Sequence, residues 1–151
     1  RAYNCCNDLY KHKGRTSPAG SAPRRNAARA YNKAFANHPN ITTPKTVNGC
    51  VSICDTCDCH VFHQYTLKIE NADRDALVKH LNNKGIPCGV YYPIPLHKQK
   101  AYLDSRYDEA NFKVTNQLVK EVISLPMHTE LDDEQIEFIT TTILNFINTN
   151  S

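Results

Sequence analysis

The chain has 151 residues, of which 40% are hydrophobic and 22% charged, a length and composition that suit one globular domain. Its net charge of +3 comes from scattered basic residues, which excludes a nucleic-acid-binding surface and leaves no nucleic-acid partner to expect. No apolar run reaches the roughly 18 residues of a membrane span and no leader resembles a secretory signal, so we expect no membrane partner and a cytoplasmic protein.

The N-terminal part predicts one helix after an irregular lead-in. The chain begins at Arg1 and its only methionine is Met127, so we expect a piece of a longer protein. Residues 1–22 have neither a helical nor a strand period, and we expect them to be poorly ordered. From Pro23, the stretch PRRNAARAYNKAFANH predicts a helix. Its apolar stripe consists of Ala27, Ala30, Tyr31, Ala34 and Phe35.

The middle of the chain predicts two strands around a helix. The stretch HVFHQYTLKI, residues 60–69, alternates like a strand. One face of this strand carries Val61, His63, Tyr65, Leu67 and Ile69. The stretch IPCGVYY, residues 86–92, predicts a second strand, which Pro93 and Pro95 prevent from continuing.

The helix between these strands is predicted by NADRDALVKHLNNKG. Either Asn71 or Asp73 caps its start, and Gly85 ends it. The expected buried stripe consists of Leu77, Val78 and Leu81.

The C-terminal part predicts two more helices separated by a short strand. In FKVTNQLVKEVISLP, the residues Val114, Leu118 and Val122 form the buried side of a helix, and ISL forms a strand before Pro126. The last helix starts at a capping box of Thr129 and Asp132. Its apolar stripe consists of Ile136, Ile139, Ile143 and Phe146 or Ile147. This order predicts an α/β fold, in which helices pack on one face of a small sheet.

Seven cysteines in a chain without an export signal indicate thiols or metal ligands rather than disulfides. Four of them are close together, with two histidines nearby: Cys50, Cys54, Cys57, Cys59, His60 and His63. The C-x2-C spacing of Cys54 and Cys57 suits a tetrahedral zinc ion. The alternative is a loop of free thiols, which the spacing favours because no second C-x2-C pair follows at the usual distance.

Two long stretches carry a family resemblance. The run HVFHQYTLKIENADRDALVKHLNNKGIPCGVYYPIPLHKQKAY and the later EVISLPMHTELDDEQI resemble the C-terminal domain of the DegT/DnrJ/EryC1/StrS sugar-nucleotide aminotransferases. The resemblance covers about residues 60–147, and weaker similarity at RRNAARAYNKAF extends it back to about residue 23. It implies that residues 23–151 form the small C-terminal domain of a fold-type I pyridoxal-phosphate-dependent transferase. Residues 1–22 would be a remnant of the junction with the large domain.

The family resemblance also implies an activity. Such enzymes are usually homodimers that move an amino group, commonly from glutamate, onto a nucleotide-linked keto sugar, a reaction used in polysaccharide biosynthesis. Pyridoxal phosphate acts as the electron sink, and a lysine forms the Schiff base. In the family this lysine lies in the large domain, and no segment of this chain matches it. We therefore assign no catalytic residue, and we expect the isolated chain to be inactive and to bind the cofactor at most loosely.

The resemblance further implies substrate-binding residues. The turn YYPIPLH would lie at the mouth of the active site, where His97 and Tyr91 or Tyr92 contact the sugar nucleotide. The alternative is a strand exit whose tyrosines pack against a neighbouring helix. His63 and Tyr65 would either contact the ligand or form a buried hydrogen-bonded pair. For the whole chain, the alternative function is a non-catalytic binding module, with or without zinc held at Cys50–Cys59.

Overall fold

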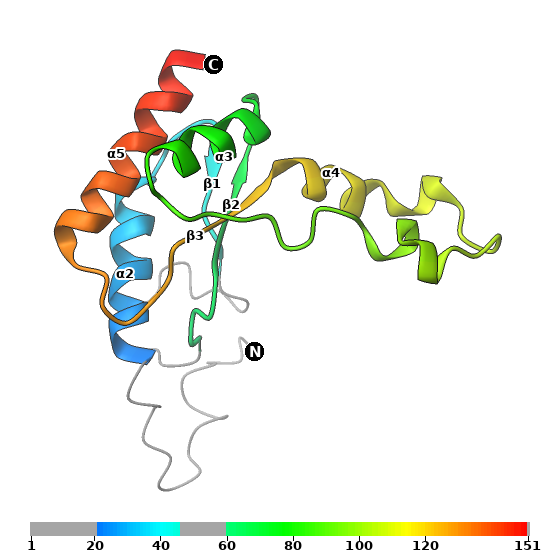
Figure 1. Ribbon diagram of the computed structural model, residues 1–151, viewed down its shortest axis with the longest axis horizontal. Coiled ribbons are helices and arrows are strands. Elements are labelled where there is room, and N and C mark those ends of the chain that lie inside the picture. Colours follow the sequence, from blue (N-terminus) through cyan, green and yellow to red (C-terminus); the bar gives the residue numbers. More distant parts are fainter. Residues whose placement is uncertain (1–20, 46–59, 151) are drawn as a thin grey trace, which may run out of the picture.

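The computed structural model describes residues 21–45 and 60–150, which form a small α/β fold. Its helices and strands are α2 (Ser21–Ala34), β1 (Ile41–Thr42), β2 (Tyr65–Ile69), α3 (Arg74–Asn83), α4 (Lys113–Glu121), β3 (Val122–Leu125) and α5 (Asp133–Asn150). Three short 3-10 helices lie between α3 and α4: η1 (Leu96–Lys98), η2 (Lys100–Tyr102) and η3 (Glu109–Phe112). Helices α2, α3 and α5 gather around the sheet, whereas α4 belongs to an arm that extends away from it (Figure 1).

The sheet is antiparallel, with β2 between β1 and β3. Alternate residues of β2 point into the core, so Tyr65, Leu67 and Ile69 are buried. Tyr65 is paired with Leu125, which is buried too. On the opposite face, the hydroxyl oxygens of Thr66 and Ser124 are 2.8 Å apart. The buried face is covered by α2, α3 and α5, which confirms the predicted sheet with helices on one face.

Helix α2 packs against α5 through a stripe that differs slightly from the predicted one. Ala27, Tyr31 and Phe35 are buried as expected, but Ala34 is exposed and Ala28 is fully buried in its place. The tight approach of α5 explains this, because a methyl group at position 28 fits between the helices. In α5 the stripe of Ile136, Ile139 and Ile143 is confirmed, and Ile147 rather than Phe146 completes it.

Helix α3 has both of its ends fixed by identifiable residues. Asp73, not Asn71, is the N-cap, and its carboxylate accepts a hydrogen bond of 2.9 Å from the Ala76 amide. Gly85 has φ of 76°, a left-handed conformation that glycine adopts without strain, so the helix ends there as predicted. Leu77 and Leu81 are fully buried, whereas Val78 is half-buried.

The capping box of α5 lies three residues further along than predicted. The Asp132 carboxylate accepts from the Gln135 amide at 2.7 Å, and the Gln135 side chain accepts from the Asp132 amide at 3.3 Å. The predicted pair, Thr129 and Asp132, is wrong because Asp132 is itself the N-cap.

Of the two predicted central strands, one is shorter than the sequence indicates and the other is reduced to a single bridge. Residues 60–64 are outside β2, because Phe62 adopts a positive φ of 46° and reverses which side chains point inward. Phe62 is buried and Val61 is 48% exposed, so Val61 does not share the buried face of Tyr65, Leu67 and Ile69 that the predicted alternation gave it. Residues 86–92 form no strand: Gly89 alone pairs with Ser124, through two backbone hydrogen bonds of 2.8 and 3.1 Å.

The arm, residues 92–121, has an apolar surface that faces outward. Val114 of α4 is 70% exposed and Leu118 is 40% exposed, so the predicted buried side of this helix is wrong. Val122 is not part of the helix, since it begins β3. In Figure 1, α4 extends away from the sheet and from α2, α3 and α5, so the helices of the core do not cover it.

Candidate functional site

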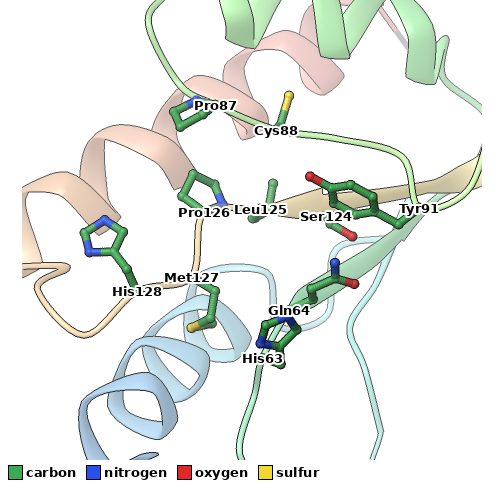
Figure 2. Close-up of a pocket in the computed structure, with 10 residues that line it drawn as sticks. All are labelled: His63, Gln64, Pro87, Cys88, Tyr91, Ser124, Leu125, Pro126, Met127 and His128. Atoms are coloured by element: carbon green, nitrogen blue, oxygen red, sulfur yellow. The ribbon is translucent and has the colours of Figure 1, made fainter. Parts of the chain in front are cut away.

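The candidate site is a pocket of about 390 Å³ at one end of the sheet. We call it the β3 pocket, and its lining consists of His63, Gln64, Pro87, Cys88, Tyr91, Ser124, Leu125, Pro126, Met127 and His128 (Figure 2). Three segments supply these residues: the approach to β2, the stretch after α3, and β3 with the turn that follows it.

The hydrogen-bonding pattern of the sheet explains why these segments meet. The β2–β3 ladder ends at the pair Tyr65 and Leu125. Beyond this pair, the chain before Tyr65 and the chain after Leu125 are free to separate and leave an opening. The bridge between Gly89 and Ser124 brings the stretch after α3 to the other edge of β3. A Cβ atom at position 89 would lie 2.9 Å from the ring of Tyr91, so a larger residue there would displace this exposed ring from the pocket wall.

The pocket combines apolar walls with several polar groups. Proline, leucine and methionine side chains form the walls, while His63, Gln64, Tyr91 and His128 bring two imidazoles, an amide and a phenol. In Figure 2 these groups come from different segments, and Met127 is drawn between the two histidines. Imidazole, amide and phenol groups can each donate or accept hydrogen bonds, which suits hydroxyl groups and phosphate oxygens of a polar ligand.

Two further groups of the pocket are chemically restrained. The Ser124 hydroxyl is engaged with Thr66, and the Cys88 thiol lies 3.8 Å from the carbonyl oxygen of Val78. Burial raises the pKa of the Cys88 thiol, which keeps it protonated near neutral pH. Neither group therefore has the character of an activated nucleophile.

The structure separates the five residues that the sequence indicated as substrate contacts. His63 and Tyr91 both line the β3 pocket. Tyr92, which is 76% exposed, lines a groove of about 460 Å³ on the arm together with Ile94 and Val119. His97 lines another arm pocket of about 260 Å³, whose lining shares no residue with the β3 pocket.

Tyr65 is part of the core rather than of a pocket wall. Its ring is fully buried, 4.9 Å from that of Tyr31, and its hydroxyl donates to the side-chain oxygen of Asn32. Burial raises the pKa of the Tyr65 phenol far above its ordinary value. The alternative of a buried hydrogen-bonded pair between Tyr65 and His63 is wrong. His63 is exposed, and the hydrogen-bond partner of Tyr65 is Asn32.

His97 is enclosed by the arm itself. Its side chain is 8% exposed, its ring stacks on that of Phe112 with centroids 4.0 Å apart, and Nε2 lies 3.3 Å from a carboxylate oxygen of Glu109. This environment leaves little of the imidazole accessible to a ligand in the described conformation.

Sequence reasoning missed much of the pocket. Gln64, Cys88, Ser124, Met127 and His128 were not among the expected contacts, although they line the same opening as His63. The signal that could have found His128 is the stretch LPMH directly after a short strand, because polar residues at strand ends commonly line pockets.

The predicted zinc ligands Cys50, Cys54, Cys57 and Cys59 lie outside the described residues, so that prediction stays open. Within residues 21–45 and 60–150, no group of three His, Cys, Asp or Glu side chains is placed to hold a metal ion. In the same part of the chain, no helix has the length and apolar character needed to cross a membrane.

The β3 pocket does not fit pyridoxal phosphate as a covalent site. Among the described residues, its lining contains neither a lysine to form an imine nor an arginine to pair with the phosphate. What the lining offers is neutral hydrogen-bonding groups on apolar walls, an arrangement that suits part of a polar ligand.

Comparison with known proteins gives one family. The model of the DegT/DnrJ/EryC1/StrS aminotransferase family matches residues 19–144. The chain is 38% identical over 106 residues to the pleiotropic regulatory protein of Geobacillus stearothermophilus, covering 70% of this chain and 26% of that protein. It is 44% identical over 84 residues to the UDP-N-acetyl-3-dehydro-alpha-D-glucosamine 3-aminotransferase of Acidithiobacillus ferrooxidans, covering 56% of this chain and 22% of that one.

Solved structures with the same fold are sugar aminotransferases. The PLP form of the putative sugar aminotransferase Spr1654 from Streptococcus pneumoniae superposes with a TM-score of 0.72 at 26% identity, over 87% of this chain and 32% of that chain. DesV of S. venezuelae, solved with a ketimine intermediate, gives 0.70 at 26% identity, over 83% and 31%. The chain thus spans about a quarter of the curated relatives and about a third of these structures.

Proposed function

The chain belongs to the DegT/DnrJ/EryC1/StrS aminotransferase family, and from this membership we propose that it is the C-terminal, substrate-binding part of a pyridoxal-phosphate-dependent sugar-nucleotide aminotransferase. The complete enzyme transfers an amino group from glutamate to a nucleotide-linked keto sugar in the cytoplasm. The observation that carries the proposal is the family match over residues 19–144, together with a fold like that of sugar aminotransferases.

In this proposal the chain contributes binding rather than covalent chemistry. When bound to the complete enzyme, pyridoxal phosphate supplies the electron sink for amino transfer. The residues described here take no step through it, because the β3 pocket lacks a lysine. His63, Gln64, Tyr91 and His128 line the pocket with hydrogen-bonding groups that suit the hydroxyl and phosphate oxygens of a nucleotide sugar.

The arm is where we propose that the rest of the polypeptide docks. Its exposed apolar side chains are Tyr92, Ile94, Leu96, Tyr102, Leu103, Tyr107, Val114 and Leu118. Soluble monomers rarely expose large contiguous apolar patches, so a concentration of exposed apolar side chains on one arm indicates a surface that another part of the protein covers. The occupant we propose is the remaining three quarters that the relatives have, in an enzyme that works as a homodimer.

A non-catalytic binding module is the second candidate function. The described lining of the β3 pocket contains no lysine, which is compatible with such a module because it needs no imine. It would bind a nucleotide sugar without converting it.

The test is a nuclear magnetic resonance titration of the ¹⁵N-labelled chain with UDP-N-acetylglucosamine. We expect shift changes at the amides of His63, Gln64, Tyr91 and His128, and their loss in His63→Ala. Val61→Ala is the matched control, since Val61 is a neighbouring exposed side chain that does not line the pocket. No change at millimolar nucleotide sugar would refute a substrate-binding role for this pocket.

The two candidate functions are separated by an assay of the complete polypeptide. With glutamate, pyridoxal phosphate and a UDP-linked keto sugar, the aminotransferase forms 2-oxoglutarate and an amino sugar. Binding of the nucleotide sugar without 2-oxoglutarate would favour the binding module.

A further inference from the structure

The side chain of His97 is 8% exposed and is enclosed by other residues of the arm. It stacks almost parallel on Phe112, at an interplanar angle of 12° and a centroid distance of 4.0 Å. Tyr107 meets the edge of the same Phe112 ring at 5.9 Å. The three rings form a small aromatic cluster at a place where the arm has no regular sheet or long helix to hold it together.

Charged groups around His97 come from two elements. Glu109 of η3 lies 3.3 Å from His97 Nε2, and Lys98 of η1 pairs with the other oxygen of the same carboxylate. The pKa of Glu109 is lowered, mainly by its hydrogen bond with Lys98. Nε2 itself is buried and has no hydrogen bond of good geometry, although the carboxylate is near. The ring stack is therefore the better-formed contact of His97.

The stack joins two parts of the arm that are separated in sequence. His97 belongs to η1 and Phe112 ends η3, next to the start of α4. Glu109 adds a second link between these parts, because its carboxylate pairs with Lys98 of η1. The same carboxylate accepts a hydrogen bond of 2.7 Å from the side chain of Asn116 in α4. The irregular loop of residues 99–108 is thus closed at its base.

The segment from Gly89 to His97 is consequently anchored at both ends. At one end Gly89 is hydrogen-bonded to Ser124 of β3, and at the other end His97 is stacked on Phe112. Between them Pro93 and Pro95 restrict the backbone, and the amide of Lys98 donates to the carbonyl of Pro95 at 2.9 Å. Tyr91 and Tyr92 lie within this doubly anchored segment.

We propose that His97 is a positioning residue, whose stack on Phe112 holds in place the segment that carries Tyr91, which lines the β3 pocket, and Tyr92, which lines the groove on the arm. Its effect on a ligand rests on the function proposed above, whereas its effect on the arm does not. This role differs from a direct substrate contact, because the ring surface of His97 matters and its nitrogen atoms do not.

Three variants of the full chain separate the two roles. His97→Phe keeps an aromatic ring for the stack and removes both nitrogens. His97→Gln keeps a hydrogen-bonding nitrogen and removes the stack. Phe112→Leu removes the partner ring and leaves His97 unchanged. Both substituted side chains, His97 and Phe112, lie outside the hydrophobic core, so folding is checked by comparing the thermal unfolding of the three variants with that of the parent chain.

Limited trypsin digestion measures how often the loop of the arm opens, without any ligand. Cleavage after Arg106, in the loop that the stack closes, is followed by mass spectrometry. We expect His97→Gln and Phe112→Leu to be cleaved about tenfold faster, in proportion to the population of the open loop, and His97→Phe to stay within about twofold of the parent. In the parent chain, the carbon-bound imidazole protons of His97 should also be shifted upfield by the Phe112 ring, and Phe112→Leu should abolish that shift.

Affinity for UDP-N-acetylglucosamine is the second readout. The proposal expects His97→Gln to weaken binding and His97→Phe to restore it to within about threefold of the parent. If the His97→Phe chain resists trypsin like the parent but loses its affinity for the nucleotide sugar, the positioning role is overturned in favour of direct contact. Equal cleavage of all variants would also overturn it. If the parent binds no nucleotide sugar, the function proposed above fails, and the cleavage order alone decides the role of His97.

Discussion

Tyr31 is a single residue that links the core to the wall of the β3 pocket. Its ring is fully buried between α2 and the sheet, and its hydroxyl donates a hydrogen bond of 3.1 Å to the carbonyl of Pro126. Pro126 lines the pocket directly before Met127 and His128. A core tyrosine therefore determines where this turn lies.

Removing that hydroxyl tests its contribution. We expect Tyr31→Phe to lower the free energy of unfolding by about 1 kcal/mol, because a part-buried carbonyl loses its partner. Urea denaturation measures the change, and Tyr107→Phe, in which the ring is exposed, is the control with no expected effect. Equal stability of both variants would mean that the Pro126 carbonyl needs no donor.

The buried tyrosines also predict a response to alkaline pH. Burial raises the pKa of Tyr31 and of Tyr65 above the ordinary value of 10.0. Since the unfolded chain releases these protons at lower pH than the folded chain, their stabilising contribution is complete below about pH 10 and is lost as pH rises above it. Phenolate absorbance should therefore rise in two steps, the exposed tyrosines first and these two together with unfolding. A single step near pH 10 in a folded chain would contradict this.

Local backbone conformation explains where residue patterns misled. Strand alternation placed Val61 on the same face as Tyr65, but a positive φ at Phe62 turns the chain and buries Phe62 instead. A non-glycine residue in this conformation has no reliable signature in one sequence, whereas the left-handed Gly85 was predictable because glycine is the usual residue there.

At the scale of elements, prediction succeeded where one face of an element is buried by the described chain. The stripes of α3 and α5 and the inward face of β2 were largely predicted, because their apolar spacing matches the burial that the fold imposes. The same logic failed for α4, where an apolar stripe of similar spacing is exposed. Periodicity therefore identifies an apolar face without identifying what covers it.

The N-terminal capping box of α5 contributes to the stability of the fold. Asp132→Ala removes the side chain that accepts from the Gln135 amide, and we expect a loss of about 1 kcal/mol in the free energy of unfolding. Thr129→Ala is the matched control, because Thr129 is the other candidate cap in the sequence and precedes the capping box. Denaturant unfolding of both variants measures the difference. A larger loss in Thr129→Ala would restore the cap that the sequence first indicated.

The whole molecule consists of a packed α/β body and an arm whose apolar surface has no cover in the described chain. The body could be predicted from sequence because its contacts join elements that alternate regularly. The pocket could be predicted only in part, since its lining depends on where the β2–β3 ladder ends and on a single bridge at Gly89. Where a strand ladder ends and where a single bridge forms depend on tertiary structure, and the spacing of residues in the sequence does not predict them.

The exposed arm predicts that the isolated chain associates with itself as its concentration rises. Apolar surface that another part of an enzyme would cover is then available to a second copy. We expect the double substitution of Val114→Lys and Leu118→Lys to suppress this association, because it places two charges on the exposed face of α4. Sedimentation velocity over a range of concentrations measures it. The melting temperature should hardly change, since neither side chain is buried in the core.

Phe138→Lys is the matched control, because Phe138 is an exposed apolar residue of α5, outside the arm, and its substitution should leave association unchanged. Association that persists in the double variant but disappears in Phe138→Lys would place the self-associating surface on the α/β core that contains α5. The arm would then not be the docking surface.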